Sequence, residues 1–138
     1  MNTDGEIIIV DDDSDDIEIF QEVYNSLPYS NKLLLFQSGE EAYQYIIQSN
    51  AHPFLIISDI NMTRMNGFQL REKVFTEAAR TGKVIPFIFL YTGAVKAMMK
   101  QYCLHDYHGY FEKRSDINAI RNTLEKIIGY WNDAVPYY

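Results

Sequence analysis

The sequence has almost no cysteine for disulfide bonds and no long apolar run for a membrane-spanning helix. Cys103 is its one cysteine, so no disulfide can form within the chain, which agrees with a reducing compartment. No apolar run approaches the roughly 20 residues that a membrane-spanning helix needs. Residues 1–6 are polar and acidic, whereas a secretory signal would begin with basic and then apolar residues. We therefore expect a cytoplasmic protein with no membrane partner.

Positive charge is also scarce. The chain has 12 lysines and arginines against 19 aspartates and glutamates, which gives a net charge of −7 at pH 7. Nucleic-acid binding relies on basic side chains that contact the phosphate backbone, so we expect no nucleic-acid partner. Hydrophobic residues, by contrast, make up 47% of the 138 positions. That is enough to build the core of one domain without disulfides.

Short apolar runs alternate along the chain with segments of helical periodicity. The apolar runs predict buried strands at residues 7–10, 33–36, 54–58, 87–90 and 109–112. Apolar residues three and four positions apart predict a helix after each strand, five in all. Pro28 ends the first helix, Gly82 closes the third, and the fourth covers residues 94–104.

Two of the helices have start signals in the sequence. Ser38 and Glu41 have the spacing of a capping box for the second helix. Ser115 can cap the last helix, whose apolar stripe extends to Trp131. We place one domain at residues 1–131, followed by a short aromatic tail at 132–138.

Strict alternation of strands and helices with short connections favours a parallel sheet with helices on both faces. Five such units in this length predict an α/β, flavodoxin-like, doubly wound fold with strand order 2-1-3-4-5 and five helices. No second domain, linker or internal repeat is visible in the sequence.

Acidic residues stand where two of the predicted strands end. The first strand runs into Asp11 and Asp12, and the third runs into Asp59. The carboxyl ends of parallel strands share one edge, and these two strands flank the switch point where such folds bind ligands, so the three carboxylates should meet. Crowded carboxylates repel one another, and a hard cation such as Mg²⁺ relieves that repulsion.

Two further polar side chains reach the same edge. Thr92 follows the fourth strand, and Lys113 follows the fifth. A hydroxyl and an ammonium suit a phosphoryl group that is carried on one of the carboxylates. Together with a divalent metal they make a phosphoryl-transfer site, which works by positioning and charge.

These motifs, in this order and at these intervals, resemble the CheY-like receiver domains of two-component signalling over nearly the whole chain. The matching segments are residues 7–12 (first strand and acidic pair), 58–67 (phosphoacceptor loop), 91–93 (threonine and small residue) and 109–113 (switch aromatic and lysine). The aromatic ending over residues 130–136 is similar to that of a subgroup of single-domain receivers associated with bacterial phytochromes.

The resemblance implies how the acidic residues act. Asp59 is the phosphoacceptor. Asp12, Asp59 and the backbone carbonyl of Asn61 bind Mg²⁺, and Asp11 assists through a water molecule. By the same resemblance the protein is a switch and not an enzyme for outside substrates, although receivers catalyse their own phosphorylation and hydrolysis.

The resemblance also implies a switch and its partners. Lys113 pairs with the phosphoryl oxygens, Thr92 moves to hydrogen-bond one of them, and Tyr110 follows Thr92 between outward and inward rotamers. The phosphoryl group comes from a histidine kinase or a phosphotransfer protein. Because the sequence has no output domain, we expect the signal to pass to a downstream protein through the face of helix 4, strand 5 and helix 5. A homodimer would form through the same face.

Two positions depart from the family pattern. Thr63 and Arg114 stand in the neighbourhoods where the family usually has proline, in the phosphoacceptor loop and directly after the lysine. The family's lysine–proline bond is commonly cis. A cis bond before a residue other than proline costs about 3–4 kcal/mol, so we predict a trans Lys113–Arg114 bond and a slightly different place for Lys113.

Other functions compete with this interpretation. A pseudo-receiver, which acts as a phosphate-independent interaction module, remains an alternative because the proline is missing. A small phosphohydrolase with an aspartate nucleophile would need a general acid, and Asn61 offers no proton where one is needed. A flavin-binding protein would need a Ser/Thr-rich phosphate loop after the first strand, and none is present.

The acidic run after the first strand has two further interpretations. Asp13, Asp15 and Asp16 suit the first turn of a helix, where negative charge complements the helix dipole. Asp11, Asp13, Asp15 and Glu22 also fall at calcium-loop positions, but Asp16 stands where the sharp turn of such a loop needs glycine.

Overall fold

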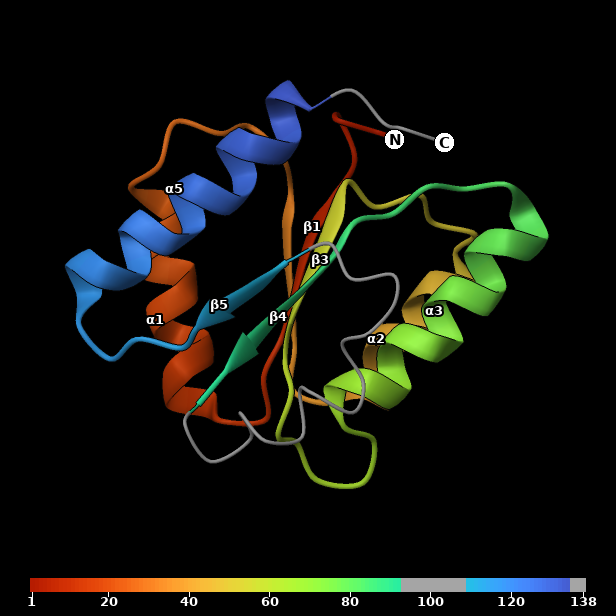
Figure 1. Cartoon of the computed structure of the whole chain (residues 1–138), viewed down its shortest axis with the longest axis horizontal. Helices are drawn as coiled ribbons and strands as arrows, with labels where there is room; N and C mark the ends of the chain where they lie inside the picture. Colours follow the sequence, from red (N-terminus) through yellow and green to blue (C-terminus); the bar gives the residue numbers. More distant parts are fainter. Residues whose placement is uncertain (93–108, 135–138) are drawn as a thin grey trace.

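The computed structural model describes residues 1–92 and 109–134. The predicted helix at residues 94–104, and residues 135–138 of the predicted tail, lie outside these ranges. In the described part, five parallel strands form one sheet in the order β2-β1-β3-β4-β5, which confirms the predicted topology (Figure 1).

Each of the five predicted strands is present, with ends within one residue of the prediction. Their bounds are β1 Ile7–Val10, β2 Leu33–Phe36, β3 Leu55–Asp59, β4 Phe87–Tyr91 and β5 Tyr110–Glu112. β3 includes Asp59 because this residue still pairs with Leu90 of β4. Val10 of β1 lies beside Ser58 of β3, so the residues that follow, Asp11 and Asp59, come together.

The described helices are α1 Ser14–Asn25, α2 Gly39–Gln48, α3 Gly67–Thr81 and α5 Ile117–Asp133. α1 and α5 cover one face of the sheet, and α2 and α3 cover the other (Figure 1). None of these described helices is long and apolar enough to cross a membrane.

Side chains of β1 alternate between the two helical layers. Ile7 and Ile9 belong to the core under α1 and α5, and Ile8 and Val10 belong to the core under α2 and α3. All four are at most 1% exposed. A strand buried on both faces has no polar alternation, which is why the sequence shows an unbroken aliphatic run here.

The helix caps differ in part from the prediction. Ser38 accepts the backbone N–H of Glu41 at 3.1 Å, but within the described residues the reciprocal bond of a capping box is absent at α2. Ser115 does not cap α5, so that prediction was wrong. Asp116 stands directly before the first helical residue, and its carboxylate accepts the N–H of Ala119 at 3.1 Å.

The acidic segment after β1 does not form a calcium loop. α1 begins at Ser14, one residue after its N-cap Asp13. The Asp13 carboxylate accepts the N–H groups of Asp15 and Asp16, at 2.8 and 3.3 Å. Asp15 and Asp16 lie in the first turn of α1, as predicted, whereas Asp13 stands one position before it as the N-cap, a role that we had not predicted.

Gly67 closes the loop that joins β3 to α3. Its N–H donates to the carbonyl of Ile60 at 2.9 Å, which folds the loop back onto the end of β3. A Cβ atom at Gly67 would lie 2.6 Å from the carbonyl oxygen of Asp59 and 2.9 Å from the Cα of Ile60. These are backbone atoms, which cannot rotate away as a side chain can. Any residue other than glycine at this position would therefore shift the backbone of Asp59 and Ile60.

We expect Gly67→Ala to lower the free energy of unfolding by about 1–3 kcal/mol, the usual cost of overpacking. Gly129→Ala is the matched control, because its Cβ would meet only the hydroxyl of Tyr29, at 3.6 Å, in the interior of α5. That change should stabilise by up to about 1 kcal/mol through helix propensity. Urea unfolding measures both, and equal stability of the two variants would contradict the close approach at Gly67.

Candidate functional site

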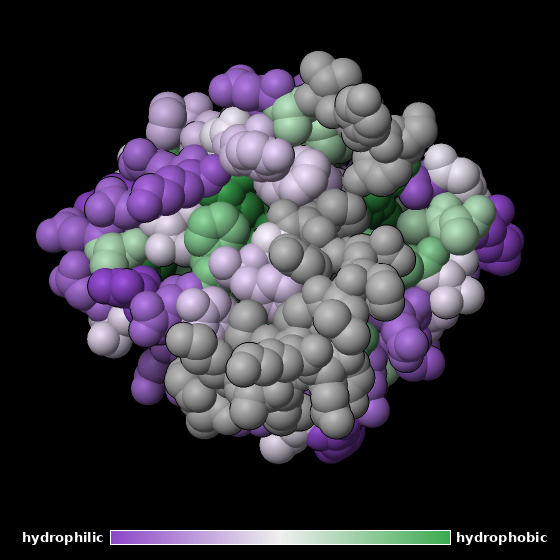
Figure 2. Space-filling model, viewed as in Figure 1, coloured by the Kyte–Doolittle hydropathy of each residue, from purple (hydrophilic) through white to green (hydrophobic). Residues whose placement is uncertain are grey.

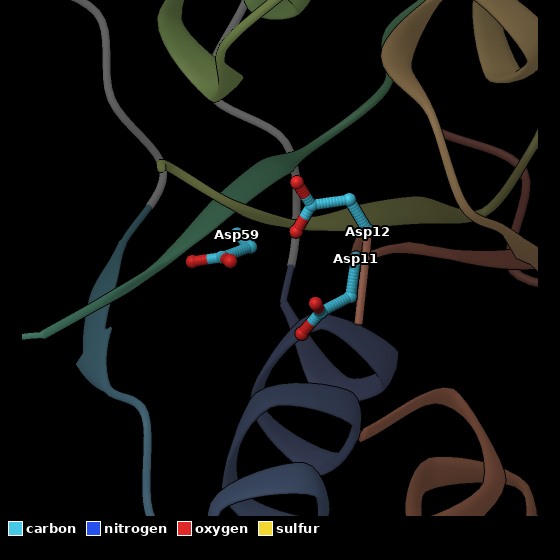
Figure 3. A group of neighbouring side chains, drawn as sticks. All are labelled: Asp11, Asp12 and Asp59. Atoms are coloured by element: carbon cyan, nitrogen blue, oxygen red, sulfur yellow. The ribbon is translucent and has the colours of Figure 1, made fainter. Parts of the chain in front are cut away.

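Three carboxylates meet where β1 and β3 end. Asp11, Asp12 and Asp59 each offer an oxygen, and these oxygens all lie within 4.8 Å of one another (Figure 3). Asp11 is 0% and Asp59 is 5% exposed, and Asp12 is the most accessible of the three. The structure thus brings together the three acidic residues that the sequence predicted to converge.

Lys113 brings a positive charge to this group from the end of β5. Its backbone N–H donates to the carbonyl of Tyr91 at 2.8 Å, which continues the pairing of β5 with β4. Its Nζ lies 2.7 Å from Oδ2 of Asp11, 2.7 Å from Oδ2 of Asp16 and 3.3 Å from Oδ2 of Asp59. The ammonium is therefore shared among carboxylates from β1, α1 and β3.

Burial and charge act against each other in this cluster. Burial raises the pKa of Asp11 to about 6, although Lys113 and the N–H of Asp13 oppose it. Burial likewise raises the pKa of Asp59, against the effect of Lys113. Burial also acts to lower the pKa of Lys113, but the contacts with Asp11 and Asp16 outweigh it and hold that pKa above its ordinary value. The lysine stays charged, and one ammonium faces more negative charge than it can balance.

The donor set fits a hard divalent cation. The three grouped residues are all carboxylates, the ligand type that Mg²⁺ and Mn²⁺ prefer. Burial raises the pKa of Asp11 and of Asp59, and the charge of a neighbouring carboxylate raises each of them further; a bound cation would relieve that repulsion. The site is one that could bind a metal ion at the carboxyl edge of the sheet.

The loop after Asp59 supplies contacts that the sequence did not predict. The backbone N–H of Asn61 hydrogen-bonds the Asp59 carboxylate. Thr63 donates its backbone N–H and its hydroxyl to Oδ2 of Asp12, at 3.0 and 3.3 Å. A complete capping box between Asn66 and Gln69 begins α3 and fixes the far end of this loop.

Asp16 is the charged residue of the site that sequence reasoning missed. We interpreted it only as a complement to the helix dipole, yet its carboxylate contacts Lys113 at 2.7 Å. No local signal in the sequence separates Asp16 from Asp15, because neither has a cation three or four positions further along α1.

Of the two predicted switch residues, Thr92 follows the last residue of β4, and Tyr110 is the first residue of β5. Thr92 is exposed directly after β4, and within the described residues it makes no hydrogen bond to the three carboxylates. Tyr110 is half-buried, and its ring stacks on Phe89 of β4 with a centroid distance of 5.1 Å. The residues between Thr92 and Gly109 lie outside the described part.

No peptide bond in the described ranges is cis, so the Lys113–Arg114 bond is trans, as predicted. Arg114 points its guanidinium at the exposed carboxylate of Glu112, with Nη1 at 3.2 Å from Oε2. Arg114 therefore makes a surface ion pair next to Lys113.

The site and the fold together define a receiver of two-component signalling. The sequence matches the response regulator receiver domain family over residues 7–125, and the chain belongs to this family.

Curated relatives and solved structures agree with this assignment. Chemotaxis protein CheY1 from two strains of Helicobacter pylori is 29% and 28% identical over 123 residues, which cover 89% of this chain and 96% of the relative. The Mn²⁺-bound form of response regulator Rcp1 superposes with a TM-score of 0.77 at 19% identity, covering 96% of this chain and 97% of that one. The phosphorylated cyanobacterial phytochrome response regulator RcpA has a TM-score of 0.77 at 21% identity, covering 96% of both chains. At these identities, the likeness to the solved structures shows the fold.

We expect Asp12→Ala to lower the affinity for Mg²⁺ and Mn²⁺ at least about tenfold, because it removes the most accessible of three grouped carboxylates. Isothermal titration calorimetry measures the affinity. Glu18→Gln is the control, since it removes one negative charge from the exposed surface of α1. If Asp12→Ala binds either metal as tightly as Glu18→Gln does, the ion binds elsewhere.

Proposed function

We propose that this chain is a phosphorylated switch: it accepts a phosphoryl group on Asp59 with the help of Mg²⁺ and thereby changes a protein-interaction surface. The observation that carries the proposal is the environment of Asp59. This carboxylate is 5% exposed at the end of a buried strand, has the ammonium of Lys113 at 3.3 Å, and shares its edge of the sheet with Asp11 and Asp12. The family supplies the expectation that a histidine kinase or a phosphotransfer protein is the donor.

In this proposal a carboxylate oxygen of Asp59 attacks the phosphorus, and the bond between phosphorus and the donor's histidine nitrogen breaks. The product is an acyl phosphate on Asp59. Lys113 pairs with the phosphoryl oxygens, since it already lies beside the nucleophile. Bound Mg²⁺ would neutralise charge that develops on the transferred oxygens. Asp12, Asp59 and the backbone carbonyl of Asn61 would hold the ion, with Asp11 acting through water.

Mutation of the phosphoacceptor tests the proposal directly. Incubation with Mg²⁺ and acetyl phosphate should add the mass of one phosphoryl group to the wild type and none to Asp59→Asn, because the amide is no nucleophile. Intact-mass spectrometry reads both, and Asp4→Asn serves as a control that keeps the site. Equal labelling of Asp59→Asn would assign the phosphoryl group to another residue. An unlabelled wild type would favour the pseudo-receiver.

The proposed output is the surface around β5 and α5. With a phosphoryl group on Asp59, Thr92 would move to hydrogen-bond it, and Tyr110 would follow into the space that Thr92 leaves. Tyr110 and Phe111 of β5 line a surface hollow together with Ile127, Tyr130 and Trp131 of α5. Tyr130 is 65% exposed, and its ring meets that of Trp131 edge to face. Figure 2 shows apolar area among hydrophilic residues in this region, which suits a downstream protein or a second copy of the chain.

We expect beryllofluoride, a phosphoryl mimic, to promote a homodimer through this surface. Light scattering with and without beryllofluoride measures the mass. Tyr130→Ser should weaken the dimer because it removes an exposed aromatic anchor. Ile117→Ser is the matched control, because it removes the other large exposed hydrophobic residue of α5, at the opposite end of the helix. A wild type that stays monomeric in both conditions would exclude the dimer and leave the surface to another protein.

A further inference from the structure

The ammonium of Lys113 has three N–H donors and three carboxylate neighbours. Asp11 and Asp16 lie closest, each at 2.7 Å from Nζ, and Asp59 lies at 3.3 Å. Asp11 and Asp59 belong to the group of three carboxylates that can hold a metal ion, whereas Asp16 does not. Asp16 is therefore a counter-ion of Lys113 with no share in the proposed metal site.

The fold holds the Asp16 carboxylate in place. Asp16 lies in the first turn of α1, and its backbone N–H donates to the N-cap Asp13 at 3.3 Å. Its side chain is 31% exposed, so it stands at the rim of the cluster while the Asp11 side chain is 1% exposed. Asp15, its neighbour in the same turn, donates its N–H to Asp13 in the same way but makes no ion pair within the described residues.

A divalent cation changes the balance of charge around Lys113. Once a cation is bound, the charges of Asp11 and Asp59 are directed to it, and the cation repels the nearby ammonium. Asp16 then keeps its full attraction for Lys113. Lys113 could then stay beside Asp59 while it remains paired with Asp16, which is not one of the three grouped carboxylates.

We infer that Asp16 is a positioning residue: it holds the Lys113 ammonium at the rim of the site, so that a divalent cation can occupy Asp11, Asp12 and Asp59. This inference rests on the proposed function and extends it to a residue outside the metal and phosphoacceptor set. Without Asp16, Lys113 pairs only with the carboxylates that the cation needs, and it competes with the cation for them.

Metal affinity of the full chain, measured by calorimetry with Mg²⁺ and with Mn²⁺, tests this role. Asp16→Asn should lower the affinity about tenfold, the scale of losses from residues that orient metal ligands. Asp15→Asn removes the same charge from the same turn without touching Lys113, and it should lower the affinity less than about threefold. Asp16→Glu keeps the charge and should recover most of the affinity.

A double-mutant cycle separates positioning from plain charge. In a Lys113→Met background, Asp16→Asn should cost no more affinity than Asp15→Asn does, because the residue through which Asp16 acts is gone. If Asp16→Asn lowers the metal affinity as much in the Lys113→Met background as in the wild-type background, the inference is overturned. So would equal affinities of Asp16→Asn and Asp15→Asn in the wild-type background, or a wild type that binds neither metal. Circular dichroism confirms that each variant is folded.

The proposed function is tested separately by acetyl phosphate labelling of the same proteins. If the wild type is labelled on Asp59 but Asp16→Asn and Asp15→Asn bind metal alike, the inference fails and the proposed function stands. If the wild type is not labelled at all, the proposed function fails, whatever the metal affinities are.

Discussion

The arrangement of side chains at the carboxyl edge of the sheet depends on one ammonium, that of Lys113, which is shared among three carboxylates. Charges buried in a protein interior are costly unless they are paired, and Asp11 and Asp59 are almost fully buried. Lys113 pairs with both, and with Asp16 at the start of α1. In the sheet order β5 is separated from β3 by β4, so the lysine side chain reaches past β4 to its partners. The ends of β1, β3, β5 and α1 thus meet in one charge network.

The same short strand connects this network to the surface. β5 has three residues, and Lys113 follows its last one. Tyr110 at its start stacks on Phe89 in the core under α2 and α3, while Phe111 packs against the core under α1 and α5. In the proposed switch, a change in the position of Lys113 would act on a strand whose side chains contact both helical layers. This arrangement supports the proposal that the site is coupled to the surface of β5 and α5.

The two departures from the family pattern have local structural effects. A proline has no N–H, whereas Thr63 uses its N–H and its hydroxyl to hold one oxygen of Asp12. Arg114 pairs with Glu112 at the surface, and exposed pairs of this kind contribute about 0–1 kcal/mol at most. The side chain of Lys113 pairs with three carboxylates of the site and that of Arg114 with Glu112, so the two neighbouring basic residues have separate partners.

Much of the fold was determined by the sequence alone, because hydrophobic periodicity and strand-end chemistry are local signals. The aliphatic run Ile7–Val10 predicted a strand buried on both faces, and the carboxylates after the first and third strands predicted where Asp11, Asp12 and Asp59 would meet. Parallel topology carried that prediction, since it places all carboxyl ends at one edge. The last helix was also predicted, but its cap was not, because Ser115 and Asp116 are both good cap residues and differ only in where the helix begins.

Only the tertiary structure determined which residues pair with one another at the carboxyl edge of the sheet. Asp15 and Asp16 are the same residue type in the same turn, and the direction in which α1 packs on the sheet selects Asp16 for Lys113. Thr63 hydrogen-bonds Asp12 across 51 residues of sequence because the loop after β3 passes beside the segment that follows β1. An ion pair or hydrogen bond between distant segments forms only if its two atoms are placed to within about an ångström. That placement depends on how a helix is rotated about its axis and on the path of a loop, and no local pattern in a sequence encodes either.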